Sequence, residues 1–208
     1  PSDLRSVVRT FQQHFAHTMM WLDHYDAALV GSAEPFAVDE AEIERRIAEP
    51  AVAGDLKRVE MGSAADLLGF FVMGTEGMTR FGRGGTLNTD DQLYLEFSAP
   101  FSIATPSVMG DNVDAIDVER ESLLPYLRPA DGPAAREAQS ARWSAQFSAG
   151  KVGDRALSRY LGSGPRSQET ALALRRLNME YPWYAPGKFL WNEYQAALAL
   201  DPRALQRT

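Results

Sequence analysis

The sequence of 208 residues contains no cysteine, and this absence excludes several kinds of chemistry. Disulfide bonds, thiolate metal sites and cysteine nucleophiles all need that side chain. Long hydrophobic runs are missing too. The apolar stretch at residues 64–73 is interrupted by Asp66 and falls well short of the roughly 18 residues that a membrane-spanning helix needs. We therefore expect no disulfide, no thiolate-bound metal and no direct membrane segment in this chain.

Positive charge is scarce in the first half of the chain. The formal net charge is −7; residues 1–100 carry 8 basic and 16 acidic side chains, whereas residues 101–208 carry 13 and 12. A nucleic-acid partner is not expected, because binding to the phosphate backbone needs a positive surface. A polycationic amine is electrostatically acceptable as a ligand.

A glycine-rich turn between a strand and a helix, which would hold the nucleoside or phosphate part of a cofactor, is not found. The run at residues 82–85, Gly-Arg-Gly-Gly, precedes a turn and a predicted strand, so we interpret it as a flexible loop. No nucleophile elbow is present either. We therefore assign no catalytic residue, no cofactor-binding residue and no cofactor to this chain.

The first hundred residues combine helical and strand patterns. Val8, Phe11 and Phe15 recur at helical spacing, and the short apolar runs 18–22 and 27–30 predict a hairpin. Residues 93–98 alternate between apolar and polar side chains and predict a further strand. Further helices are predicted from Asp39 to Pro50, from Asp55 and over residues 64–73.

The second half is predicted to be helical. Proline and glycine punctuate residues 101–132, which favours a linker between two domains. The helices expected beyond it cover residues 134–149, 154–161, 168–180 and 188–200. The last of them resembles the closing helix of a tetratricopeptide repeat, and Pro202 is expected to stop it.

One segment resembles a known family. Residues 87–100, with the sequence LNTDDQLYLEFSAP, are similar to a segment near the end of the spermidine-synthase-like domain in bacterial proteins where that domain follows a membrane-embedded transporter-like region. Residues 3–32 and 43–74 extend the resemblance upstream. The chain departs from the family at Ala16, at Gln92-Leu93, where the family usually has Arg-Pro, and at Phe101, where it usually has Arg.

The resemblance implies an α/β fold. Residues 1–100 would be the C-terminal part of a Rossmann-like, methyltransferase-type sheet with a helical insert, residues 101–132 a linker, and residues 133–208 an all-α, tetratricopeptide-like tail. The chain would then be the C-terminal part of a longer polypeptide, and the remainder of that polypeptide would be its first partner. The resemblance places the protein on the cytoplasmic side, with its parent anchored in the inner membrane.

The reaction implied by the resemblance is aminopropyl transfer from decarboxylated S-adenosylmethionine to putrescine. The expected catalytic carboxylate is not in this chain, so we expect the segment alone to be inactive. Two alternatives stay open: a non-catalytic module that binds a protein partner through its helical tail, and a methyltransferase-like protein that uses S-adenosylmethionine.

The candidate substrate-binding residues lie just after the first predicted strand, at the end that faces the amine cleft in the family. They are Trp21, Asp23, His24 and Tyr25. An aromatic wall with a carboxylate suits an alkylammonium ligand, through cation–π attraction and a charge-assisted hydrogen bond. The alternative is an ordinary turn beside a core tryptophan.

Asp90 and Asp91 form a second candidate amine site. Neighbouring side chains on an extended chain point to opposite sides, so both can serve one ligand only if the turn bends. We favour a structural turn in which residues 88–91 hydrogen-bond the local backbone.

Two further groups have ordinary interpretations. His14 and His17 could ligate zinc with Asp23, but His17 is predicted to lie beyond the helix, and we expect no metal site. An aromatic cluster near the C-terminus could bind a partner, but we favour helix-to-loop packing. Its members are Tyr181, Trp183, Tyr184, Phe189, Trp191 and Tyr194.

Overall fold

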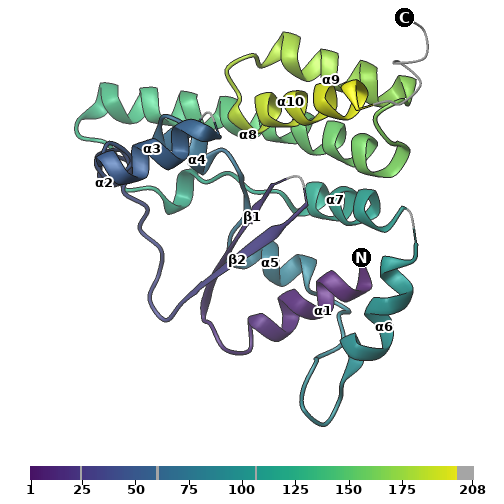
Figure 1. The fold of residues 1–208 in the computed structure, drawn as a ribbon. Helices are drawn as coiled ribbons and strands as arrows, with labels where there is room; N and C mark the ends of the chain where they lie inside the picture. The colour runs from purple at the N-terminus through teal and green to yellow at the C-terminus, as the bar shows by residue number, and fades with distance from the viewer. Residues whose placement is uncertain (24, 60, 106, 201–208) are drawn as a thin grey trace, which may run out of the picture.

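The computed structural model describes residues 1–23, 25–59, 61–105 and 107–200, and within these residues it is mainly helical, at 62%. Its only sheet in this part of the chain has three antiparallel strands in the order β2-β1-β3. The helices surround this sheet, and the C-terminal helices lie beyond one end of it (Figure 1). The elements are α1 Ser2–Phe11, β1 His17–Leu22, β2 Ala27–Ser32, α2 Glu40–Ile47, α3 Pro50–Arg58, α4 Ala64–Leu68, β3 Phe71–Met73, α5 Thr75–Phe81, α6 Tyr94–Ile103, α7 Val108–Glu119, the 3-10 turn η1 Leu124–Tyr126, α8 Pro133–Ser163, α9 Gln168–Glu180 and α10 Ala185–Ala199.

The β1–β2 hairpin separates two hydrophobic cores. Met19 pairs with Val30, and Met20 pairs with Leu29 on the opposite face, as the two-residue side-chain period of strands requires. Met20 and Leu29 belong to a core formed with α1 and α5. Met19 belongs to a second core, which α2, α4 and η1 complete. The hairpin predicted from residues 18–22 and 27–30 is thus confirmed.

The third core belongs to the C-terminal helices. Leu157 of α8, Leu174 and Leu177 of α9, and Leu190 of α10 are buried against one another. Val113 of α7 joins this core. Residues 101–132, expected as a linker of low order, therefore contain a helix that packs into the rest of the protein.

A buried ion pair joins the sheet to the tail. Arg120, which follows α7, donates from Nε to Asp154 Oδ2 at 2.5 Å and from Nη2 to Oδ1 at 2.8 Å, while its Nη1 donates to the carbonyl of Phe71 in β3 at 2.8 Å. The side chains of Arg120 and Asp154 are 4% and 6% exposed. The Tyr184 hydroxyl donates to the Gly69 carbonyl at 3.1 Å beside them.

Glycine makes room for this pair inside α8. A Cβ at Gly150 would lie 2.4 Å from Arg120 Nη1, and one at Gly153 would lie 3.0 Å from the Tyr184 ring. The sequence analysis interpreted this region as a break between helices at 134–149 and 154–161. That prediction was wrong: α8 is continuous over 31 residues, because the glycines accommodate neighbouring side chains rather than end the helix.

Near its N-terminal end, α8 is also bonded to α2. Gln139 Nε2 donates to Glu40 Oε2 at 2.7 Å, and Arg142 Nη2 donates to Glu40 Oε1 at 2.5 Å. Asp39 begins α2 as predicted, because its side chain accepts the N–H of Glu42.

The predicted fold class was wrong. The chain does not contain a Rossmann-like, methyltransferase-type sheet with a helical insert among its described residues. Such a sheet consists mainly of parallel strands joined by helices, whereas β1 here pairs antiparallel with both neighbours. The third strand, β3, comes from residues 71–73, which were predicted as the end of a helix over 64–73. That helix ends at Leu68, and short apolar runs such as this fit a buried strand or a buried helix equally well.

Of residues 93–98, predicted as a strand, Leu93 is the N-cap of helix α6 and the others belong to that helix. The side chain of Asn88 accepts the N–H of Leu95 in the first turn, and Ser102 Oγ donates to Asp3 of α1. The apolar side chains at 93, 97 and 101 recur every four residues, so the segment fits a helix as well as a strand. Phe97 and Phe101 are 74% and 78% exposed on its outer face.

Two smaller predictions meet different outcomes. Asp55, predicted as a helix N-cap, lies inside α3, which begins at Pro50 because proline suits the first helical position. Ser63 is confirmed as the N-cap of α4, since it accepts the N–H of Asp66. Pro202 lies outside the described residues.

The C-terminal aromatic cluster mainly packs helices, as favoured. Tyr184 and Tyr194 are buried in the third core, and Tyr181 and Trp191 pack against it. Trp183 is 42% exposed and touches Tyr181 edge-on, with ring centroids 6.0 Å apart.

We predict that Asp154→Ala lowers the free energy of unfolding by about 3–5 kcal/mol, because it leaves the Arg120 charge buried without a partner. Chemical denaturation monitored by circular dichroism measures this loss. Asp55→Ala is the matched control: its pair with Arg58 is exposed, so its loss should stay below about 1 kcal/mol. The double variant Arg120→Met/Asp154→Leu should recover most of the stability, and a loss for Asp154→Ala no larger than the control's would contradict the assignment.

A second prediction concerns high pH. Burial raises the pKa of Tyr126, Tyr160 and Tyr184 to about 12, whereas an unfolded tyrosine ionises near pH 10. The unfolded chain then releases protons that the folded protein keeps, so stability that is present below pH 10 is lost as the pH rises towards 12. Phenolate absorbance of the folded protein should show Tyr126, Tyr160 and Tyr184 ionising only near their pKa of about 12. A single transition of all seven tyrosines near pH 10 in the folded protein would refute this.

Candidate ligand-binding groove

Strand β1 positions the predicted aromatic wall. Trp21 lies on the same face of the hairpin as Met19 and pairs across the strands with Ala28. Its ring meets the Phe71 ring edge-on, with centroids 5.5 Å apart and planes at 76°. This packing fixes the indole at the end of the strand.

The carboxylate of Asp23 closes the hairpin turn. Asp23 Oδ1 accepts the backbone N–H of Tyr25 at 2.9 Å and that of Asp26 at 2.8 Å. The Asp23 N–H donates in turn to the Asp26 carbonyl at 3.0 Å. Both recorded side-chain bonds use Oδ1, so within the described residues Oδ2 is left for a ligand.

Trp21, Asp23 and Asp26 border a groove of about 550 Å³. This volume is in the range of small-molecule sites. Strand β2 forms one side of the groove, while α2, α4 and their flanking loops form the other, because these short helices cover only part of this face of the sheet. Apart from the two aspartates the lining is apolar; it includes Ala28, Val30, Val38, Ile43, Met61 and Leu67.

The other predicted residues of the hairpin turn do not join this lining. Tyr25 instead hydrogen-bonds Tyr160 of α8. His24 lies outside the described residues. The candidate site therefore keeps Trp21 and Asp23 of the four predicted residues and gains Asp26, which the sequence analysis missed although it is a carboxylate in the same turn.

Asp90 and Asp91 lie far from the groove. They are exposed in the long loop between α5 and α6, at the opposite end of the molecule from the β1–β2 turn (Figure 1). Within this long loop, residues 89–92 form a tight turn, in which Thr89 and Gln92 exchange backbone hydrogen bonds at 3.1 and 3.0 Å. The structural turn favoured from the sequence is thus confirmed.

The three residues considered for zinc do not come together. His17 begins β1 and Asp23 follows its end, so about 20 Å of extended chain separates them at the rise of a strand. Across the described residues, no cluster of three or more metal-ligating side chains is found. Likewise, none of the described helices is long and apolar enough to cross a bilayer.

Comparisons with known proteins give no identification: no family model, curated protein or solved structure matches this chain significantly. The resemblance of residues 87–100 to the spermidine-synthase-like domain stays a prediction from the sequence.

Proposed function

We propose that the chain is the amine-binding part of a spermidine-synthase-like protein and that its groove binds an alkylammonium ligand such as putrescine. One observation carries this proposal: among the described residues, the only charged side chains that line the groove are two carboxylates, and they lie beside an indole wall. An alkylamine has the matching chemistry, with a cationic end and a flexible apolar chain.

One ammonium group and the methylene chain of the ligand each have a counterpart. The ammonium would donate a charge-assisted hydrogen bond to Asp23 Oδ2 and would be attracted to the Trp21 ring by a cation–π interaction. The methylene chain would lie along the apolar side chains of β2, α2 and α4, which removes its surface from water. Asp26 would add a second negative charge at the same end of the groove.

Under this proposal the chain binds the acceptor amine but does not transfer the aminopropyl group by itself. Transfer from decarboxylated S-adenosylmethionine also needs a nucleoside site and a base that takes the amine proton, and we assign neither to these residues. The spermidine-synthase resemblance and the methyltransferase alternative both implied a methyltransferase-type sheet, which is not found among the described residues, so the proposal rests on the groove and not on the fold.

The second candidate function, binding of a protein through the helical tail, is supported by a stripe of exposed apolar side chains. Leu172 and Met179 of α9 are 57% and 82% exposed and lie seven residues apart on one helical face, and Trp183 follows. Polar replacement of Leu172 and Met179 should abolish complex formation without changing amine binding if this function is correct.

We predict that Asp23→Asn weakens putrescine binding about tenfold, because it removes one charge-assisted hydrogen bond, and that Trp21→Leu weakens it as well. Isothermal titration calorimetry measures both effects. The asparagine retains a carbonyl oxygen that can accept the two backbone N–H groups of the turn.

The matched control is Asp91→Asn, which removes the same charge from the remote loop and should leave the affinity unchanged. 1,4-Butanediol, a neutral analogue of similar length, should not bind. An absence of putrescine binding, or equal weakening by Asp91→Asn, would overturn the proposal.

A further inference from the structure

The outer face of α6 carries a row of exposed apolar side chains. Phe97 and Phe101 are mostly exposed, and Leu93, the N-cap of the helix, is partly exposed. The three positions are four residues apart, so their side chains form one ridge along the helix. Among the described side chains, none of α6 belongs to the three hydrophobic cores. A ridge of this kind fits the groove on the surface of a second helix.

Helix α6 is held on α1, so its outer face is a fixed surface. Ser102 Oγ donates to the carboxylate of Asp3 in α1, and the Thr10 hydroxyl of α1 accepts the N–H of Asn88 at 3.0 Å. The Asn88 side chain accepts in turn the N–H of Leu95, in the first turn of α6, at 2.9 Å. A partner therefore meets an ordered helix, and little conformational entropy is lost on this side when it binds.

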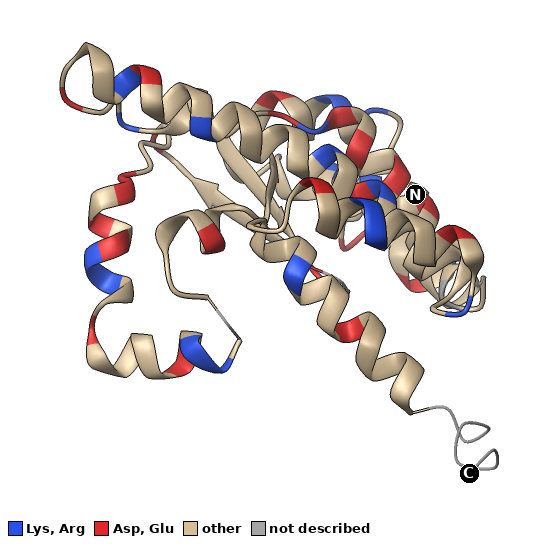
Figure 2. Cartoon of the chain, turned by 90° about the horizontal axis from the view of Figure 1, so that it is seen from above, with Lys and Arg blue, Asp and Glu red and all other residues tan. Residues whose placement is uncertain are grey.

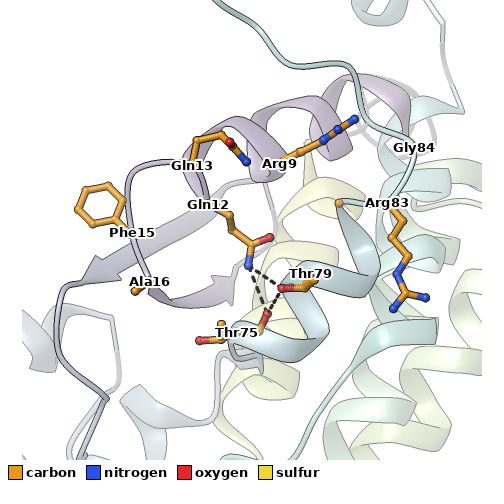
Figure 3. Close-up of a pocket in the computed structure, with 10 residues that line it drawn as sticks. Arg9, Gln12, Gln13, Phe15, Ala16, Thr75, Thr79, Arg83 and Gly84 are labelled. Atoms are coloured by element: carbon orange, nitrogen blue, oxygen red, sulfur yellow. Dashed lines mark hydrogen bonds between the residues drawn. The ribbon is translucent and has the colours of Figure 1, made fainter.

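Helix α1 is fixed in turn on α5 and the sheet. Gln12 Nε2, at the C-terminal end of α1, donates to the Thr75 carbonyl of α5 at 3.2 Å (Figure 3). The Thr75 hydroxyl accepts the N–H of Thr18 in β1 at 3.0 Å. Gln12 also borders a cavity of about 490 Å³, whose lining includes Arg9 and Arg83 and which we call the arginine-lined cavity. The support of α6 thus extends through α1 and α5 to the sheet.

The surroundings of this face are acidic. Residues 84–119, which include α6 and α7, contain seven aspartates and glutamates and no lysine, arginine or histidine. Most of the other helices carry both signs of charge (Figure 2). Asp90, Asp91 and Glu96 are exposed just before α6 and in its first turn, and within the described residues none of them forms an ion pair. Carboxylates without a counter-charge beside an apolar ridge favour a basic partner.

The same charge argues against other occupants of this face. Two copies of the chain that paired their α6 helices across a two-fold axis would use the same surface on both sides, so their acidic groups would be brought together. A nucleic acid and an anionic membrane surface would be repelled for the same reason. Charge complementarity therefore points to a cationic protein segment.

We propose that the outer face of α6 binds a basic amphipathic helix of a partner protein. The apolar side of that helix would cover Phe97 and Phe101, which removes both rings from water. Its arginine or lysine side chains would pair with the carboxylate of Glu96 and with those of the preceding turn. This surface lies away from the β1–β2 turn and from α9 (Figure 1), so it is separate from the amine-binding groove and from the exposed stripe of the tail.

The probe is a fluorescein-labelled, N-acetylated peptide of about 18 residues, long enough to form a helix, with leucine at helical spacing and arginine at the other positions. Fluorescence anisotropy measures its binding to the whole chain. Phe97→Gln and Phe101→Gln should each weaken binding about tenfold, because each removes apolar surface that the peptide covers. Val118→Gln is the matched control: Val118 is 76% exposed in the same acidic run but belongs to α7, so its replacement should leave the affinity unchanged.

A charge reversal tests the second half of the proposal. Glu96→Lys should weaken binding about tenfold, whereas Glu137→Lys, the same reversal at an exposed position of α8, should not. The replaced side chains are exposed, so unchanged melting temperatures separate loss of the site from misfolding. The peptide has no alkylammonium group, which keeps the result independent of the amine-binding proposal.

Three results would overturn the proposal. The first is no binding of the peptide to the unaltered protein, and the second is equal weakening by the control variants. The third is dimerisation of the chain by itself in sedimentation velocity, abolished by Phe97→Gln, which would assign this face to a second copy.

Discussion

The buried pair of Arg120 and Asp154 is the interaction on which the arrangement of the whole chain depends. One guanidinium donates hydrogen bonds directly to the carboxylate of α8 and to a backbone carbonyl of β3, so it joins the sheet to the tail. The cost of removing both charges from solvent is offset only because each has a full set of partners. Gly150 is a geometric condition for the pair, since any side chain there would occupy the position of Arg120.

Two cavities lie at opposite ends of strand β1. Phe15 and Ala16, just before the strand, border the arginine-lined cavity, while Trp21 and Asp23, at and beyond its end, border the apolar groove.

Local signals in the sequence predicted local structure well. The hairpin, the caps at Asp39 and Ser63 and the turn at residues 88–91 all follow from interactions between residues close in the chain. The pairing of strands far apart in the chain could not be predicted from such local signals, because β3 and β1 contact through residues about fifty positions apart. The same holds for the sites. Trp21 and Asp23 could be proposed from their types, but the apolar side chains of α2 and α4 that complete the groove come from later in the chain, and no spacing in the sequence marks them.

The length of α8 has a mechanical consequence. A helix of 31 residues spans about 46 Å at the usual rise per residue. Its N-terminal part is bonded to Glu40 of α2, a helix that lines the groove, and its C-terminal part packs on α9. Because α8 is one continuous helix held at both ends, a tilt of its N-terminal part would also disturb the packing of its C-terminal part on α9. Movement of α2 away from the sheet would therefore be resisted by the tail, which makes the width of the groove a property of the whole molecule rather than of the residues that line it.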